Sequence, residues 1–319
     1  MVMPAMSEPF LGIAQPPVAP PPAPGSEAMN TTSSLPAITG GAIRRQGTFT
    51  ARVTRDGSSG FPAEPARYQL YASLACPWSQ RTLIAARLLG LDRVVGLTLT
   101  DPVVDERGWR FGPGEDGADP LTGARFVADL YRAAAPSYPG PFTIPLLWDL
   151  HTRQVVSNDV AQITVMLETE FRAFHRPGAP DLYPATRRRD IESLATLIFH
   201  TVNTGVYKAS LASSQSGYEQ AADGIFTTLD ALDERLARRR FLLGDQLTEA
   251  DIRLYPTLAR FDTVYYSSSG ATSGGWWTTG TCGDTPATCT RCPASARPPS
   301  SGRSSSTTTA RPSGVTPLA

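Results

Sequence analysis

The chain has 319 residues, a length that accommodates two domains with separate hydrophobic cores. Lysine plus arginine and aspartate plus glutamate number 29 each, so charge favours neither nucleic acid nor a membrane surface as a partner. No apolar run reaches the length of a transmembrane helix, and the N-terminus lacks the basic stretch and apolar core of a secretory signal.

Only one of the four cysteines, Cys76, lies in the central part of the chain. The other three lie close together near the C-terminus, at Cys282, Cys289 and Cys292. This distribution is not that of a disulfide framework, and it predicts a protein of the reducing cytoplasm.

Residues 1–59 show no hydrophobic periodicity and contain a proline cluster at 16–24, which predicts a disordered arm. Met29 is an alternative start to Met1. The end of the arm, Gly47 to Arg52, has a more structured character and leads into the first strand.

Residues 60–172 alternate strand and helix patterns and are predicted to form an α/β domain. A long connection that contains Gly108 to Phe111 follows the second strand, and Pro145 interrupts a later strand, as a cis proline at a bend would. The order β-α-β-α-β-β-α is thioredoxin-like. The expected elements are strands at 67–76 and 94–99, a strand pair within 142–149, a strand at 154–157, and helices at 77–89, 124–134 and from an Asn158 or Asp159 cap to 167.

Cys76 ends the first predicted strand and is followed at once by Pro77 and a helical pattern. Proline suits the first turn of a helix, so Cys76 is expected at the helix N-terminus, where free N–H groups and the helix dipole favour a thiolate. The alternative is that Cys76 is a small buried hydrophobic residue.

Residues 173–265 have a helical pattern throughout. Amphipathic helices are predicted at 190–202 and 218–236, and a third helix begins at Thr248 and extends to about Tyr265. Thr248 and Asp251 form a capping box, with Leu247 expected to pack on Ile252.

Several ordered motifs between about Gly47 and Tyr265 resemble the glutathionyl-hydroquinone reductases, the Xi class of the glutathione transferase superfamily. The resemblance implies a thioredoxin-like N-terminal domain followed by an all-α glutathione-transferase C-terminal domain. The motifs are Ser-Leu-Ala-Cys-Pro-Trp from Ser73, Gly-Trp-Arg-Phe from Gly108, Val-Ser-Asn-Asp from Val156, Asn-Thr-Gly-Val-Tyr-Lys from Asn203 and Thr-Glu-Ala-Asp-Ile-Arg-Leu from Thr248.

This resemblance implies that a glutathionyl-hydroquinone and a second glutathione become hydroquinone and oxidised glutathione. Cys76 would be the nucleophile and would form a mixed disulfide with glutathione. Tyr207 resembles the family's proton-transfer tyrosine, with a buried core tyrosine as its alternative, and Tyr265 resembles a tyrosine that hydrogen-bonds the thiolate. The resemblance also implies glutathione as co-substrate, a homodimer, and no metal, nucleic-acid or membrane partner.

Glutathione-binding residues are implied at Trp109, along Pro141, Phe142, Thr143 and Ile144, and at Asp159 and Val160. The backbone of Ile144 would pair with the cysteinyl part of glutathione. Two departures from the family occur. Asp159-Val160 replaces the usual Glu-Ser pair, and Pro141 stands where an arginine is common. Losing a charge-assisted bond costs about 1.5–3 kcal/mol, which predicts roughly ten- to a hundredfold weaker glutathione binding.

Residues 266–319 consist mainly of Ser, Thr, Gly, Ala, Pro and Arg without hydrophobic periodicity. A disordered tail and a metal or redox site at Cys289 and Cys292 are two interpretations. A third interpretation accounts for more of this segment. Reading residues 269–293 one nucleotide earlier, with suitable synonymous codons, gives a family-like segment, and the same shift gives another at 304–311. The sequence therefore predicts a frameshift-derived, disordered tail and an incomplete helical domain.

Two further functional hypotheses follow from these residues. A broader thiol transferase resembling the omega class would need Cys76 but not Tyr207. An inactive scaffold or an unstable product would follow from the altered glutathione contacts and the lost C-terminal helix.

Overall fold

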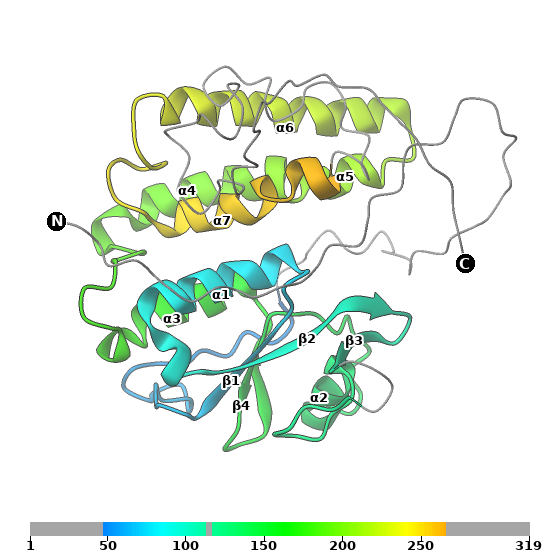
Figure 1. The fold of residues 1–319 in the computed structure, drawn as a ribbon, viewed down its shortest axis with the longest axis vertical. Coiled ribbons are helices and arrows are strands. Elements are labelled where there is room, and N and C mark those ends of the chain that lie inside the picture. The colour runs from blue at the N-terminus through cyan, green and yellow to red at the C-terminus, as the bar shows by residue number, and fades with distance from the viewer. Residues whose placement is uncertain (1–46, 113–116, 266–319) are drawn as a thin grey trace, which may run out of the picture. The chain divides into compact units, whose positions relative to one another are not determined.

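The computed structural model describes residues 47–112 and 117–265. These residues form an α/β half followed in sequence by an all-helical half, as the sequence predicts (Figure 1). None of the described helices is both long and apolar enough to span a membrane. The frameshift-derived tail predicted at 266–319, with its three cysteines, and the arm up to residue 46 lie outside the described residues.

A five-stranded sheet in the order β3-β2-β1-β4-β5 forms the centre of the α/β half. The pair β1–β2 is parallel and the pairs β1–β4, β4–β5 and β2–β3 are antiparallel, which gives the predicted thioredoxin-like layout. The strands are β1 (Tyr68–Ala72), β2 (Gly96–Asp105), β3 (Gly108–Phe111), β4 (Leu146–Asp149) and β5 (Gln154–Ser157).

Strand β3 corrects the sequence prediction, which assigned Gly108 to Phe111 to a long connection. The prediction ended the second strand at residue 99, whereas β2 continues to Asp105 and turns directly into β3. Val104 pairs with Trp109 in this hairpin. Trp109 is therefore placed on a strand at the edge of the sheet rather than in a free loop.

The sheet separates two hydrophobic clusters because its strands are covered on both faces. Helices α1 (Pro77–Leu89) and α3 (Val160–Thr169) pack against each other on one face, together with Leu70 and Leu147 (Figure 1). Helix α2 (Val127–Ala134) packs on the other face, in the cluster that contains Cys76. Cys76, which precedes α1 and packs in the cluster with α2, is thus at the boundary between these two layers.

Residues 47–59 are packed onto the α/β half, unlike the disordered arm predicted to extend to residue 59. Thr50 forms a bridge with Ser157 of β5. Val53 is fully buried in the core, and its N–H donates to the Met166 sulfur at 3.0 Å. One apolar side chain between polar neighbours is too weak a pattern to predict this packing from sequence.

The helical half contains a hydrophobic core formed by all its helices. The capping box predicted at Thr248 is present, since the Thr248 N–H donates to the Asp251 carboxylate at 3.0 Å. The helix predicted at 190–202 ends earlier and continues as a π-helical turn. The elements are α4 (Arg188–Ile198), the π-helical turn Phe199–Asn203, α5 (Gly205–Ser210), α6 (Gln215–Leu236), α7 (Glu249–Leu258) and the π-helical turn Phe261–Tyr265.

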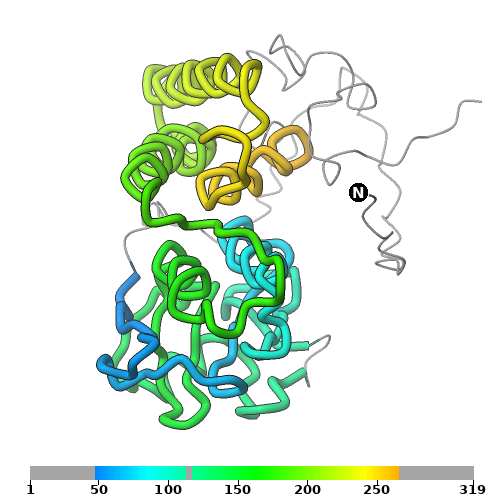
Figure 2. The backbone as a smooth tube through the Cα atoms, turned by 90° about the vertical axis from the view of Figure 1, so that its left-hand side faces the viewer, coloured from blue at the N-terminus to red at the C-terminus, as the bar shows by residue number. Residues whose placement is uncertain are grey.

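The two halves are joined by the connection after α3, which Figure 2 shows in green as it passes from the α/β half to the helical half. The boundary predicted between residues 172 and 173 falls in this connection. Helix α1 packs against α7 across the junction. Arg260 also spans it, donating to the Leu74 carbonyl at 2.9 Å and to the Gln80 side chain. Helix α1 therefore contacts both halves.

Candidate active site

Cys76 is the N-cap of α1, at the junction of the two halves. Its backbone is extended (φ −88°, ψ 116°), and Pro77 occupies the first helical turn as predicted. The N–H of Ser79 donates to the Cys76 sulfur at 3.5 Å. The same N–H and the helix dipole would stabilise a negative charge on this sulfur. Cys76 is a free thiol with a relative exposure of 7%. It is therefore both a buried residue and a thiol at a helix N-terminus, and the two interpretations of the sequence are compatible.

The loop that precedes β4 faces the cysteine. The Cys76 thiol approaches the Ile144 carbonyl, with 3.9 Å between sulfur and oxygen. The Ile144–Pro145 peptide bond is cis, as the strand proline predicts, and Gly140–Pro141 is a second cis bond that was not predicted. The backbone of Ile144 is therefore within reach of a thiol compound bound to Cys76.

Aromatic side chains hold this loop. The Tyr131 hydroxyl donates to the Thr143 carbonyl at 2.8 Å, and the Tyr138 hydroxyl donates to the Pro141 carbonyl at 3.1 Å. Phe142 packs against both tyrosine rings. Three of the four loop residues predicted to contact glutathione, Pro141, Phe142 and Thr143, are thus held by these two tyrosines.

Tyr207 and Tyr265 meet from two parts of the helical half. Tyr207 comes from α5 and Tyr265 from the final π-helical turn, and their hydroxyl oxygens are 3.3 Å apart. The ring of Tyr207 also stacks on Trp78, which follows Cys76 by two residues, at 6.4 Å between centroids. The structure thus brings both predicted tyrosines to the start of α1.

Burial raises the pKa of Tyr207 above the ordinary tyrosine value, and the hydrogen bond from Tyr265 partly opposes this rise. Burial also raises the pKa of Tyr265, and the proximity of Tyr207 adds to it. A thiolate at Cys76 would add to the rise at both tyrosines. Both hydroxyls therefore keep their protons at neutral pH, as a proton donor requires.

Trp109 lies on the same side of the molecule as the loop. Its half-buried side chain packs against the hydrophobic cluster that includes Cys76 and Ile144. It extends from β3, so a strand rather than a loop sets its position. The contact of Trp109 with glutathione stays a prediction.

Asp159 and Val160 stand at the beginning of α3. Asp159 is the N-cap, and one carboxylate oxygen accepts from the N–H groups of Ala161 and Gln162 at 3.0 and 3.1 Å. Val160 is buried at 6% relative exposure. The carboxylate is thus engaged by its own helix, and the neighbouring position offers no hydroxyl.

Sequence reasoning did not identify a group of buried polar residues beside the site. The Arg81 guanidinium donates to the Asn203 side-chain oxygen at 2.6 Å, and the Asn203 amide donates to the Thr257 hydroxyl at 2.7 Å. Arg81 also lies over the ring of Trp78, 4.5 Å from its centroid. The available signal was the spacing of Trp78 and Arg81, three residues apart and hence on one helix face.

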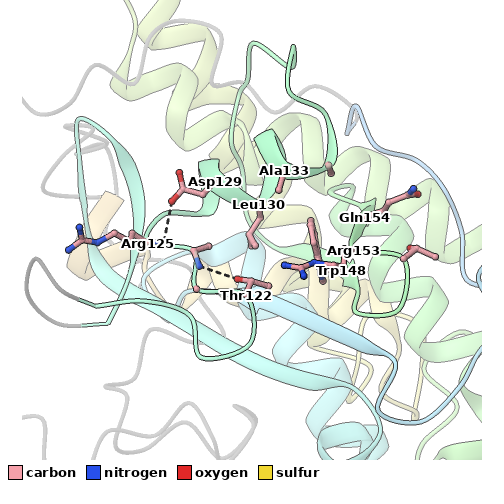
Figure 3. A pocket seen from close by; sticks show the side chains of 12 residues that line it. Thr122, Arg125, Asp129, Leu130, Ala133, Trp148, Arg153 and Gln154 are labelled. Atoms are coloured by element: carbon pink, nitrogen blue, oxygen red, sulfur yellow. Dashed lines mark hydrogen bonds between the residues drawn. The ribbon is translucent and has the colours of Figure 1, made fainter.

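A cavity of about 640 Å³ lies elsewhere, between α2 and the turn from β4 to β5 (Figure 3). Figure 3 shows the N–H of Arg125 bonded to Asp129, while the Arg125 guanidinium points away from the other labelled residues. The cavity shares none of its lining residues with the predicted site. In the described ranges, 47–112 and 117–265, no group of three or more His, Cys, Asp or Glu side chains is placed to hold a metal ion.

Comparison with known proteins agrees with this geometry. The family model described as "Glutathione S-transferase, C-terminal domain" matches residues 215–280. The chain is 43% identical over 211 residues to glutathionyl-hydroquinone reductase PcpF of Sphingobium chlorophenolicum, covering 65% of this chain and 66% of that protein. It is 43% identical over 236 residues to glutathionyl-hydroquinone reductase YqjG of Escherichia coli, covering 71% and 72%. It is 38% identical over 232 residues to glutathione S-transferase omega-like 2 of Schizosaccharomyces pombe, covering 70% and 74%.

Solved structures give the same picture. The Xi glutathione S-transferase of Phanerochaete chrysosporium is 40% identical and superposes with a TM-score of 0.69, over 72% of this chain and 79% of that one. The glutathione-bound structure of YqjG is 42% identical and has a TM-score of 0.67, over 71% and 76%.

Proposed function

Because the chain belongs to the glutathionyl-hydroquinone reductases, the Xi class of the glutathione transferase family, we propose that it reduces glutathionyl-hydroquinones with glutathione. The family predicted from the motifs is thereby confirmed. One observation supports the reaction above all others. The cysteine at the N-terminus of α1 accepts the Ser79 N–H at 3.5 Å, and Trp78, two residues further on, stacks on Tyr207, whose hydroxyl lies 3.3 Å from that of Tyr265.

In the first step, the Cys76 thiolate attacks the thioether sulfur of the substrate. A sulfur–sulfur bond forms between Cys76 and glutathione, and the carbon–sulfur bond breaks with its electron pair moving to the ring carbon. The Ser79 N–H, 3.5 Å from the Cys76 sulfur, stabilises the attacking thiolate.

The ring carbon then takes a proton from Tyr207, which completes the hydroquinone and leaves a tyrosinate. Tyr265, whose hydroxyl is 3.3 Å from that of Tyr207, stabilises this tyrosinate by donating a hydrogen bond. Tyr265 would thus hydrogen-bond the proton donor Tyr207, in addition to the hydrogen bond to the thiolate that the family resemblance implies.

A second glutathione restores the enzyme. Its thiol returns a proton to Tyr207, and its thiolate attacks the glutathionyl sulfur of the mixed disulfide. Oxidised glutathione leaves, and Cys76 departs as a thiolate. One thioether and one glutathione are consumed, and one hydroquinone and one oxidised glutathione are formed.

Glutathione binding is proposed along Pro141 to Ile144 and at Trp109, with the backbone of Ile144 pairing with the cysteinyl part. The carbonyl of Ile144 lies 3.9 Å from the Cys76 sulfur, which supports this assignment. Asp159 and Val160 would receive the γ-glutamyl end. Because Asp159 caps its own helix and Val160 is apolar, we propose that glutathione binds weakly at that end.

Reduction of a glutathionyl-hydroquinone by the wild-type protein and by Cys76→Ser tests the proposal. The wild type is expected to release hydroquinone and oxidised glutathione in equal amounts, and the variant is expected to be inactive. Full activity of Cys76→Ser would refute the mechanism.

A second candidate is a thiol transferase that reduces mixed disulfides, favoured by the similarity to a protein named omega-like. This reaction uses Cys76 but protonates no carbon. Replacing Tyr207 by phenylalanine separates the two functions, because only reduction of the thioether requires its proton.

We further propose a homodimer in the cytoplasm. The family resemblance supports the dimer, and the free thiol at Cys76 suits a reducing compartment. Analytical ultracentrifugation and cell fractionation test these two statements.

The shifted reading frame after about residue 266 also remains a proposal of its own. Resequencing the locus tests it, because a confirmed frame without a gained or lost nucleotide would refute it.

A further inference from the structure

Arg81 is a buried cation that connects the nucleophile's helix to the helical half. It lies on α1, five residues after Cys76, and its relative exposure is 5%. Its guanidinium donates to the Asn203 side chain at 2.6 Å, and Asn203 in turn donates to Thr257 of α7 at 2.7 Å. All three side chains are buried, so these hydrogen bonds are shielded from water and restrict the positions of the three residues.

Asn203 stands at the beginning of the segment that carries Tyr207. It ends the π-helical turn, and α5 starts two residues later at Gly205. This segment also packs closely against α6, because a Cβ atom at Gly205 would lie only 2.8 Å from the Ile225 Cγ1 atom. Holding Asn203 therefore limits where the backbone can place Tyr207.

Arg81 reaches Tyr207 by a second route through Trp78. Its guanidinium carbon lies 4.5 Å from the centroid of the Trp78 ring, a cation–π distance. Trp78 stacks on the Tyr207 ring with an interplanar angle of 20°. The Trp78 ring is thus held by a cation and in turn supports the ring of the proton donor.

We propose that Arg81 is a positioning residue that fixes Tyr207 relative to the start of α1, through Asn203 along the backbone and through Trp78 along the ring. This inference rests on the proposed function, since it concerns the step in which Tyr207 protonates the ring carbon. A small displacement of a proton donor lowers the rate of such a step strongly. The positive charge of Arg81 also favours the tyrosinate that remains after the transfer.

The test compares two reactions of the same enzyme, reduction of a glutathionyl-hydroquinone and reduction of bis(2-hydroxyethyl) disulfide with glutathione. Only the first protonates a carbon. Arg81→Met is expected to lower kcat for the thioether about tenfold or more and to leave disulfide reduction within about twofold. Arg81→Lys keeps the charge and can still donate a hydrogen bond, so it is expected to recover part of the loss. The matched control is Arg87→Met, at an exposed arginine of the same helix, with both activities unchanged.

The pH profile provides a second readout. Without the cation, the tyrosinate is less stable, so the alkaline fall of thioether reduction should move to higher pH in Arg81→Met. Asn203→Ser, which cuts only the backbone route, is measured in the same way and replaces Arg81→Met if that variant does not fold. The smaller drop expected of Asn203→Ser must again be confined to the thioether.

Equal loss of both reactions, or no loss of either, would overturn the positioning role. A wild-type protein that reduces the disulfide but not the thioether would instead refute the proposed function. The two failures are thereby distinguished.

Discussion

Two helices of the α/β half begin with nearly the same backbone and a different cap. Cys76 at α1 has φ −88° and ψ 116°, and Asp159 at α3 has φ −87° and ψ 110°. The sulfur accepts one long contact of 3.5 Å, whereas the carboxylate accepts two N–H groups at 3.0 and 3.1 Å. The weakly bonded cap remains available for chemistry, and the strongly bonded cap is committed to its helix. One backbone geometry at a helix N-terminus can therefore present either a nucleophile or a structural cap, depending on the side chain.

The largest effect expected concerns the reactive cap. Cys76→Ser keeps a capping oxygen but removes the sulfur nucleophile, so thioether reduction should fall by at least about a thousandfold while the helix is retained. Steady-state kinetics and a thermal melting curve measure both. Serine is a good N-cap, so a large drop in melting temperature would show that Cys76 has the structural role here assigned to Asp159.

A smaller loss is expected from Tyr207→Phe, which removes the proposed proton donor and leaves the cap intact. Thioether reduction should fall about a hundredfold, and disulfide reduction should be unchanged. Because the pKa of Tyr207 is raised above the ordinary value of 10.0, wild-type activity should lose its proton donor only above pH 10. Anaerobic pH–rate profiles check this, and a fall near neutral pH assigned to Tyr207 would contradict the raised pKa.

The cap of α3, where we propose that glutathione binds, can be altered toward the family pattern. The double variant Asp159→Glu, Val160→Ser restores the longer carboxylate and the hydroxyl, so glutathione should bind roughly ten- to a hundredfold more tightly. Isothermal titration with the Cys76→Ser background measures binding without turnover. Unchanged affinity would mean that this end of α3 does not receive glutathione. Val160→Thr alone serves as the control, since it adds a hydroxyl without lengthening the acid.

The other end of α3 holds a carboxylate in the opposite situation. Glu168 is 2% exposed, and within residues 47–112 and 117–265 neither of its carboxylate oxygens has a hydrogen-bond partner. Burial raises its pKa well above the ordinary value, and the negative charge of Glu249 adds to this rise. Arg253 opposes the rise, whereas Asp181 and Glu192 reinforce it. Glu168 is therefore protonated in the folded protein under conditions where it is ionised in the unfolded chain.

This difference predicts that stability falls as pH rises above 4.5, since the unfolded chain then releases a proton that the folded protein keeps. The contribution can reach about 1.4 kcal/mol per pH unit until the folded group also ionises. Glu168→Gln should remove this slope and make the protein more stable at neutral pH. Denaturant titrations from pH 5 to 8 measure it. Glu170→Gln, on an acid whose carboxylate accepts from the N–H of Arg55, is the control.

Local patterns predicted the elements that their own residues specify. Pro77 after Cys76 marked the start of α1, and Thr248 with Asp251 marked the start of α7. The sequence did not predict strand β3, because its four residues show no alternation of apolar and polar side chains. The strand forms by pairing with the extension of β2. Helix α5 has only six residues, too few for a clear helical period.

The contacts of the site were less predictable than its residues. The family motifs pointed to Cys76, Tyr207 and Tyr265, and the structure brings these together. Arg81 and Asn203 are 122 positions apart in sequence, and no periodicity reports a hydrogen bond over that separation. The capping bonds of Asp159 depend on a rotamer, which the sequence does not specify. Polar contacts between residues far apart in sequence could therefore be identified only from the structure.

The smallest effect tests the comparison of the two caps directly. Asp159→Ala removes two hydrogen bonds to α3 and should lower the free energy of unfolding by about 1 kcal/mol. Cys76→Ser removes the weak sulfur contact but keeps the side-chain volume and a capping acceptor, so it should lower this free energy by only about 0.3 kcal/mol. Urea titrations at pH 7 compare both variants with the wild type. Equal destabilisation would mean that the sulfur anchors its helix as firmly as the carboxylate does, and a cysteine held in that way would be a poor nucleophile.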